Sequence, residues 1–235
     1  MPASPSATRN QYASIARMSG PLIVNNLAVA GMNFADTVMS GRLGADALAA
    51  VAVGASTWML VFSACLGLLM AISPLIARLY GAGEIDRIGR YSRHGMYIGF
   101  GLGVLILVFG RPFAETFLTV IGIDPAFRHL TVEYVRALLF GAPGILVFIA
   151  LRFTVEGVGY TRPIMFTSLF SLCCNVVLNY ALMFGKLGAP ALGVVGCAWA
   201  SAITMWLVAL ALALYITLSP RLKQLGVFSR IGRPR

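Results

Sequence analysis

The segment from Gly20 to Gly41 constrains this chain most, because it is apolar and carries a single charged side chain, Asp36. A stretch of this length can cross the roughly 30 Å hydrocarbon core of a bilayer as a helix. A carboxylate at the centre of a span costs roughly 2.5 to 3.5 kcal/mol, so it normally faces a cavity or a partner and marks an ion pathway. At the membrane rim a carboxylate costs little and does not indicate an ion pathway. The segment alone leaves both positions open for Asp36.

Composition places the chain among membrane proteins. Hydrophobic residues make up 59% and charged residues 11% of its 235 residues, whereas an average soluble chain is about half apolar and a quarter charged. This length suffices for one bundle of spans and leaves no sizeable soluble domain, which excludes a cytosolic enzyme. No His, Cys or paired-carboxylate cluster indicates a membrane enzyme either, so we predict that the chain is not an enzyme.

The net charge of +10 does not indicate a nucleic-acid partner. The basic residues are scattered between apolar runs and gather at the end of the chain, whereas a nucleic-acid interface needs one continuous basic stripe. We interpret them as topology signals. The four cysteines lie within apolar runs without the spacing of zinc ligands or of a disulfide framework, and we expect them to be small core residues.

Uncharged windows predict an all-α membrane protein, a bundle of six transmembrane helices over residues 18–219. A cytoplasmic segment, residues 1–17, precedes the bundle, and a basic cytoplasmic tail or linker, residues 220–235, follows it. The fourth window is short, so its helix is expected to begin near Thr131 and to carry Glu133 and Arg136 as an interfacial ion pair. The six windows are residues 18–35, 47–77, 94–110, 137–151, 163–185 and 187–220.

Counting Lys and Arg by side predicts the orientation. The N-terminus, the second and fourth loops and the tail hold 13, and the other side holds five. The positive-inside rule therefore predicts a multi-pass protein of the cell (inner) membrane with both termini in the cytoplasm.

Proline and glycine positions predict local features of these helices. Pro21 and Pro163 are expected in the first turn of the first and fifth helices, where proline is tolerated. Pro74 is expected to kink the second span. Small residues allow another helix to approach closely, and the third helix is expected to offer such a face at Gly99, Gly101 and Gly103.

Four polar side chains share one predicted depth. With a rise of about 1.5 Å per residue, Asp36 lies roughly 22 Å from the cytoplasmic start of its helix, and Asn175 and Asn179 lie roughly 18 and 24 Å from theirs. Ser201 of the sixth helix falls roughly 18 Å from the same face. A shared buried pocket is geometrically allowed. Alternatively, the asparagines only bond neighbouring helices, as polar residues in bundles often do.

Three stretches of the sequence resemble the multidrug and toxic compound extrusion (MATE) family of NorM-like efflux transporters. They are NFADTVMSGRLGADALAAVAVG, ARLYGAGEIDRIGRYSRHG and LRFTVEGVGYTRPIMFTSLFSLCCNVVLNYALMFGKLGAPALGVVGCAWAS. The resemblance covers nearly all of the chain from Gly20 to Ser219. It implies a secondary antiporter that exports cationic or amphipathic organic compounds, such as drugs, in exchange for H⁺ or Na⁺.

The resemblance also assigns candidate residues. The acidic residue of the family's first helix falls on Asp36, its polar fifth-helix positions on Asn175 and Asn179, and its sixth-helix hydroxyl on Ser201. These four are the predicted cation-coupling site, with Na⁺ at Asp36 as the one metal ion that it would hold and with no cofactor besides the coupling ion. Three further residues of the first helix are candidates for the wall of the substrate cavity, namely Met32, Phe34 and Met39.

The chain departs from the family pattern in length. The family resembles two six-helix bundles around a cavity, and this sequence stops after the first, so we expect an N-terminal half whose partner is a second bundle from a missing C-terminal half. Two rivals remain open. A lipid-linked precursor flippase would need basic residues in its spans, for which only Arg136 and Arg152 are candidates, and a non-transporting membrane subunit would leave Asp36 unexplained.

Overall fold

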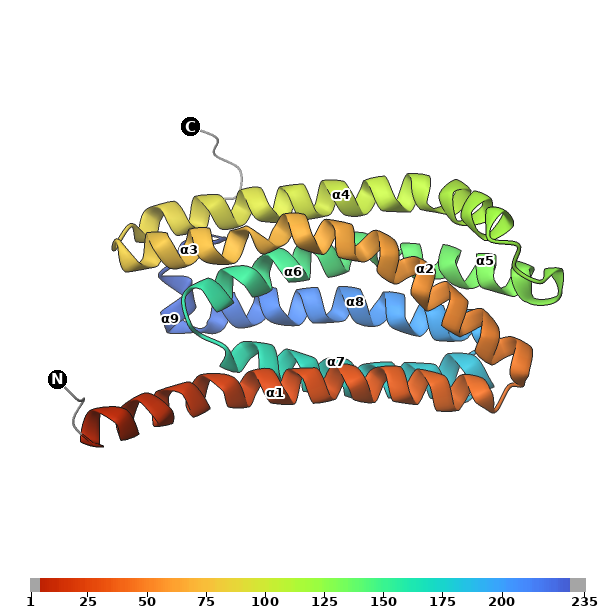
Figure 1. The fold of residues 1–235 in the computed structure, drawn as a ribbon, viewed down its shortest axis with the longest axis horizontal. Helices are drawn as coiled ribbons and strands as arrows, with labels where there is room; N and C mark the ends of the chain where they lie inside the picture. The colour runs from red at the N-terminus through yellow and green to blue at the C-terminus, as the bar shows by residue number, and fades with distance from the viewer. Residues whose placement is uncertain (1–4, 229–235) are drawn as a thin grey trace.

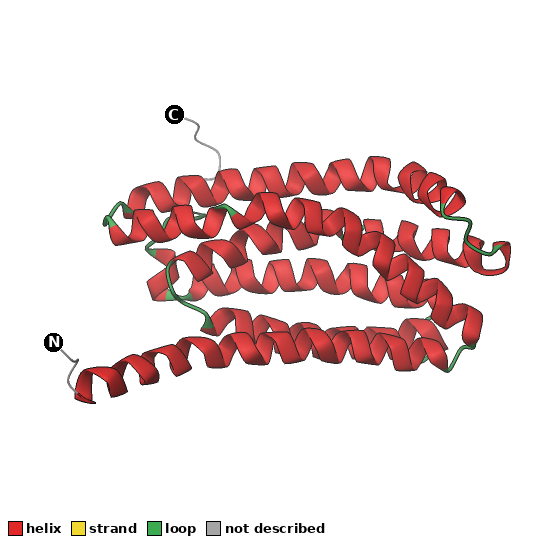
Figure 2. Cartoon of the chain, in the orientation of Figure 1, coloured by secondary structure: helices red, strands yellow, loops and turns green. Residues whose placement is uncertain are grey.

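The computed structural model describes residues 5–228, with side-chain environments from residue 19 onward, and all regular structure in this range is helical (Figures 1 and 2). Five helical segments of this part, α2 and α3 counted together, are long and apolar enough to cross a membrane, and there are six if the bent pair α5 and α6 forms one span. The predicted six-span helical membrane fold is therefore confirmed. The helices are α1 (Pro5–Gly41), α2 (Ala45–Met70), α3 (Ile72–Gly81), α4 (Ile85–Val120), α5 (Pro125–Leu139), α6 (Ala142–Gly157), α7 (Arg162–Phe184), α8 (Gly193–Leu218) and α9 (Pro220–Lys223).

Helix α1 begins earlier than the sequence predicts. It starts at Pro5, so Pro21 lies inside the helix and the expectation of a first-turn proline there was wrong. A proline removes one N–H from the ladder and bends a helix without always ending it. In α7, by contrast, Pro163 does occupy the first turn, as predicted.

The second span is interrupted between α2 and α3 at Ala71. Pro74 lies three residues further on. Because it has no N–H to donate to the carbonyl of Met70, α2 ends at Met70. The predicted disturbance of this span by Pro74 is confirmed.

The fourth span consists of two helices, and the prediction of a single helix from near Thr131 was wrong. Helix α5 begins at Pro125, where the side chain of Asp124 accepts a hydrogen bond from the backbone N–H of Ala126 at 2.9 Å. Helices α5 and α6 meet at an angle of 50° across Phe140 and Gly141. Pro143 has no N–H for the carbonyl of Leu139, so the ladder cannot continue through this point.

A side chain from another helix stabilises this break. The indole N–H of Trp206 on α8 donates a hydrogen bond to the carbonyl of Phe140 at 2.9 Å. Trp206 is 40% and Phe140 is 44% exposed at the bundle surface, and apolar surroundings would offer this carbonyl no other donor. The Phe140 ring also stacks on Trp199, with ring centroids 5.1 Å apart. The sequence-predicted pair at the α5 surface forms as well, with 3.6 Å between Arg136 and Glu133.

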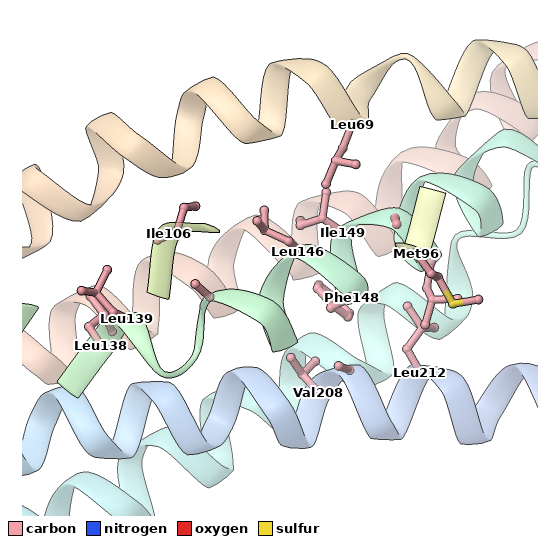
Figure 3. Packing of buried hydrophobic residues seen from close by; sticks show 14 of the residues in the cluster. Leu69, Met96, Ile106, Leu138, Leu139, Leu146, Phe148, Ile149, Val208 and Leu212 are labelled. Atoms are coloured by element: carbon pink, nitrogen blue, oxygen red, sulfur yellow. The ribbon is translucent and has the colours of Figure 1, made fainter. Parts of the chain in front are cut away.

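Helix α6 lies at the centre of the bundle, between α4 and α8 (Figure 1). Figure 3 shows Leu69 and Ile106 near Ile149 and Leu146 of α6 on one side, and Val208 near Phe148 on the other. The α6 residues with no exposed surface are Ala142, Leu146, Ala150, Leu151, Thr154 and Val155.

Two glycines of α4 allow α6 to come this close. A methyl group on Gly99 would lie 2.7 Å from the carbonyl oxygen of Leu146, and one on Gly103 would lie 2.3 Å from the Cα of Pro143. The predicted small-residue face is confirmed at these two positions. It was wrong at Gly101, where a methyl group would meet nothing within 4 Å.

The chain alternates direction through the bundle, so that the start of α1 and the end of α8 lie at the same end (Figure 1). The loops between α3 and α4 and between α6 and α7 lie at this end too. These are the loops that the sequence predicts to lie on the same side as both termini. Past α8, the chain stays packed on the bundle as far as residue 228. Leu222, Leu225 and Val227 are buried, and the guanidinium of Arg93 on α4 donates to the carbonyl of Gly226 at 2.7 Å.

We predict that Trp206→Phe lowers the stability of the bundle by about 1 kcal/mol, or about 2 to 4 °C in Tm. The substitution keeps an aromatic ring but leaves the Phe140 carbonyl without its donor at the lipid surface. Tm is measured on detergent-purified protein by size-exclusion chromatography after heating. Trp58→Phe is the control, because Trp58 stacks on Phe62 and its indole N–H makes no hydrogen bond within the described structure. Equal shifts in the two variants would show that the Trp206 bond contributes nothing.

Candidate functional site

The candidate site lies where α1, α7 and α8 meet. Helices α1 and α7 run side by side in the same direction (Figure 1), and α8 returns antiparallel beside α7. Asn175 and Asn179 are four residues apart on α7 and therefore share one face of that helix. Both side chains are completely buried, whereas the Asp36 side chain on α1 is half-buried.

A chain of hydrogen bonds joins all four residues that the sequence places at one depth. The side-chain amide of Asn179 donates to the Asp36 carboxylate at 2.5 Å and to Oδ1 of Asn175 at 3.0 Å. The amide of Asn175 donates in turn to the hydroxyl of Ser201 at 3.3 Å. The structure thus brings Asp36, Asn175, Asn179 and Ser201 together in one cluster that connects three helices.

One acceptor in this cluster has no donor. Both N–H groups of the Asn179 amide are used, but its Oδ1 is buried and, within the described structure, makes no hydrogen bond. A buried oxygen in this state costs about 1 to 3 kcal/mol. An amide oxygen beside a carboxylate is a suitable ligand for a hard cation or acceptor for a proton donor. The cluster therefore has the chemistry of a site for H⁺ or Na⁺.

The structure adds residues that the sequence analysis missed. The Cys197 thiol on α8 lies beside the Asp36 carboxylate, Ser40 and the Tyr134 side chain. Cys197 comes one turn before Ser201, so the i, i+4 spacing on α8 was a usable signal. We had interpreted this cysteine only as a core residue. Tyr134 is 3% exposed, with its ring against Gly54 of α2, so the polar cluster extends to the α2 and α5 side of the bundle.

The three candidates for a substrate-cavity wall do not share one surface. Phe34 is 71% exposed. Met32 turns toward α7, where the hydroxyl of Ser171 lies 3.3 Å from its sulfur. Met39 packs against the buried core. Of the three, only Phe34 presents its side chain outward.

Two arginines in the spans form ion pairs. Arg152 and Glu156 of α6 lie 2.8 Å apart, and Arg136 pairs with Glu133. A phosphate-bearing lipid would need free cations here, so these pairs do not favour the flippase alternative. Across residues 5–228, no group of three or more His, Cys, Asp and Glu side chains is placed to hold a metal ion. An apolar groove between α2 and the end of α4, lined by Ala52, Leu60 and Phe117 among others, lies away from Asp36.

Fold and site together define a six-span helical membrane protein with a carboxylate and amide cluster between its spans. The chain belongs to the MATE family, because the MatE family profile matches residues 21–181. The resemblance that the sequence motifs indicated is thereby confirmed.

Relatives and a solved structure agree with this assignment. Multidrug resistance protein NorM of Vibrio vulnificus (strain YJ016) is 36% identical over 228 residues, 97% of this chain and 50% of that protein. Multidrug resistance protein MdtK of Edwardsiella ictaluri (strain 93-146) is 37% identical over 210 residues, 89% of this chain and 46% of that protein. A solved outward-facing conformation of a multidrug resistance MATE family transporter of the MOP superfamily gives a TM-score of 0.79 at 26% identity, over 87% of this chain and 45% of that one. The chain therefore spans about half the length of the curated relatives it matches.

We predict that Asn179→Ala destabilises the bundle more than Ser201→Ala does. Asn179 donates two hydrogen bonds, one of them to a carboxylate, and its loss is expected to cost about 1 to 3 kcal/mol. Ser201 accepts one long bond, and its loss is expected to cost less than about 1 kcal/mol. Thermal unfolding of the purified variants gives both values. The reverse order would show that Asn179 is not the residue that holds the cluster together.

Proposed function

We propose that this chain is one bundle of a secondary active antiporter that exports cationic or amphipathic organic compounds, including drugs, in exchange for H⁺ or Na⁺. Membership in the MATE family supports a transporter of this kind, and so do the names of the relatives, which are multidrug resistance proteins. In the proposed mechanism, the cargo is a small organic compound and no cofactor takes part beyond the coupling ion.

The observation that carries the proposal is the hydrogen-bonded cluster of Asp36 with Asn179, Asn175 and Ser201. Asp36 is the only carboxylate of this cluster, so it is the group whose charge a proton or Na⁺ would neutralise. Neutralisation weakens the charge-assisted bond from Asn179, because a protonated carboxyl is a poorer acceptor than a carboxylate. Binding of the cation is thereby linked to the contact between α1 and α7, and a transporter needs such a link between ion and conformation.

The half-length of the chain supports a two-bundle assembly. In the proposed transporter, a second six-helix bundle packs against this one, and the cargo binds between them during alternating access. Helix α1 leaves large apolar side chains uncovered, with Leu27 66% and Phe34 71% exposed. Such a surface suits lipid, a second bundle or an apolar cargo.

The proposed location is the cell (inner) membrane, with both ends of the chain in the cytoplasm. Its support is the unequal number of Lys and Arg residues on the two sides, 13 against five, and the grouping of the richer loops at one end of the bundle (Figure 1).

We predict that Asp36→Asn abolishes ion-coupled export by this bundle when it is assembled with a second bundle. The amide keeps the size and the hydrogen bonding of the carboxylate but cannot change its charge, and an amide costs less to insert than a carboxylate. Cargo efflux is measured in vesicles under an imposed H⁺ or Na⁺ gradient, with the purified yield as a check on folding. Asp46→Asn and Asp124→Asn are the matched controls. Asp46 lies in the first turn of α2, and Asn can replace Asp124 as the cap of α5. Undiminished coupling in Asp36→Asn at normal yield would remove the proposed site.

We also predict that the 235-residue chain expressed alone does not confer drug efflux, because it supplies only one wall of the proposed cavity. The measurement is ethidium accumulation in cells that produce this chain, compared with cells that produce a full-length NorM relative. Ion-dependent lowering of ethidium by the 235-residue product itself would replace the two-bundle proposal with an assembly of two copies of this chain.

A further inference from the structure

We propose that Asn25 and Ser168 are positioning residues, which hold α1 in register with α7 so that Asp36 meets Asn179 three helical turns away. The Ser168 hydroxyl on α7 lies 2.5 Å from Oδ1 of Asn25 on α1 and 2.7 Å from the carbonyl of Ile164 on its own helix, and its one proton is shared between these two acceptors. Both side chains are buried, Asn25 at 4% and Ser168 at 6% exposed. This contact lies outside the Asp36 cluster and within the same seam between α1 and α7.

The two contacts have the same register. Asn25 and Ser168 are 143 positions apart in the sequence, and so are Asp36 and Asn179. Along each helix the two contact residues are separated by 11 positions, which is close to three turns and about 17 Å of rise. Because α1 and α7 run in the same direction, one register satisfies both contacts, and a slip that breaks one also breaks the other.

Between these two points, the side-chain contacts across the seam are weaker. Gly31 faces Leu172 there without a tight fit, because an added methyl group would make an ordinary contact at 3.5 Å. The hydroxyl of Ser171 and the sulfur of Met32 form only a weak hydrogen bond at 3.3 Å. In a bilayer, helices gain nothing from the hydrophobic effect when they pack together, so polar contacts and close packing determine their register.

The amide of Asn25 is itself oriented within the structure. Its N–H group donates to Oδ1 of the neighbouring Asn26 at 3.2 Å, which leaves the oxygen of Asn25 facing Ser168. The two contacts differ in one respect that matters for coupling. The Asp36 contact involves a group that the coupling ion would neutralise, whereas Asn25 and Ser168 carry no charge at any physiological pH. The Asn25–Ser168 contact therefore keeps α1 attached to α7 while the Asp36–Asn179 contact responds to the ion.

Only the response of the Asp36–Asn179 contact to an ion rests on the proposed function. The register itself is tested without transport, on the 235-residue chain in detergent or nanodiscs, by a double-mutant cycle of Asn25→Ala and Asn179→Ala. Residues that are about 17 Å apart and share no partner normally have additive effects on stability. If Asn25 holds the register, Asn25→Ala already weakens the Asp36–Asn179 contact, and the double variant loses less Tm than the two single losses combined.

The expected shortfall is more than about 2 °C, because independent sites agree to within about that amount. Thr167→Val with Asn179→Ala is the matched control. Thr167 adjoins Ser168 and is 4% exposed, but its hydroxyl bonds only to carbonyls of its own helix, so the pair is expected to be additive. Ser168→Ala repeats the cycle from the α7 side with the loss of one hydroxyl, and it decides the question if Asn25→Ala does not fold. Additive losses in the Asn25 or the Ser168 cycle overturn the proposal, whatever the outcome of the export assay.

Discussion

A carboxylate inside a bilayer has to find its hydrogen-bond partners within the protein, and this constraint accounts for the arrangement around Asp36. Water is absent from the hydrocarbon region, so an unpaired polar group there costs several kcal/mol. The donor for Asp36 comes from α7, and the Cys197 thiol of α8 lies close to the same carboxylate. Both helices reach the same level because they form a tight hairpin. Gly185 adopts a left-handed conformation with φ of 66°, and Gly196 lies so close to α7 that a methyl group there would be 2.5 Å from the carbonyl oxygen of Leu182.

The same constraint applies to the backbone wherever a span is broken. Pro143 interrupts the ladder between α5 and α6, and Trp206 of α8 supplies the donor that the Phe140 carbonyl would otherwise lack. The bend has a consequence for the site, because it allows α5 and α6 to follow different directions. Helix α6 occupies the centre of the core, while α5 places Tyr134 beside Cys197 and against Gly54. A straight helix could not keep both contacts. The break therefore connects the core to the polar cluster.

Much of the fold was predictable from the sequence, because span length and loop punctuation depend on local composition. The same holds for the shared depth of Asp36, Asn175, Asn179 and Ser201, since the rise of a helix is constant and four polar residues in apolar spans are conspicuous. The start of α1 was missed because a proline is compatible with both the first turn and the interior of a helix, and the sequence around Pro21 does not decide between them. The partners of Cys197 lie on α1 and α5, and the donor that satisfies the Phe140 carbonyl lies on α8, so no local pattern reveals these contacts. The identity of the coupling ion is equally beyond a local pattern, since the same carboxylate and amide oxygens suit H⁺ and Na⁺.

Helix α1 is the least enclosed of the spans that contribute to the site. It packs mainly against α7, and Ile23, Leu27 and Phe34 are each more than half exposed. In the proposed antiporter, its two polar contacts with α7 are unequal. The Asn25–Ser168 bond is indifferent to the coupling ion, whereas the Asp36–Asn179 bond weakens when the carboxylate is neutralised. A helix attached in this way would move at its Asp36 end and remain fixed at its Asn25 end. A change of one charge is then sufficient to shift α1 between two positions, provided that the two differ by no more than the energy of one charge-assisted hydrogen bond, about 1.5 to 3 kcal/mol.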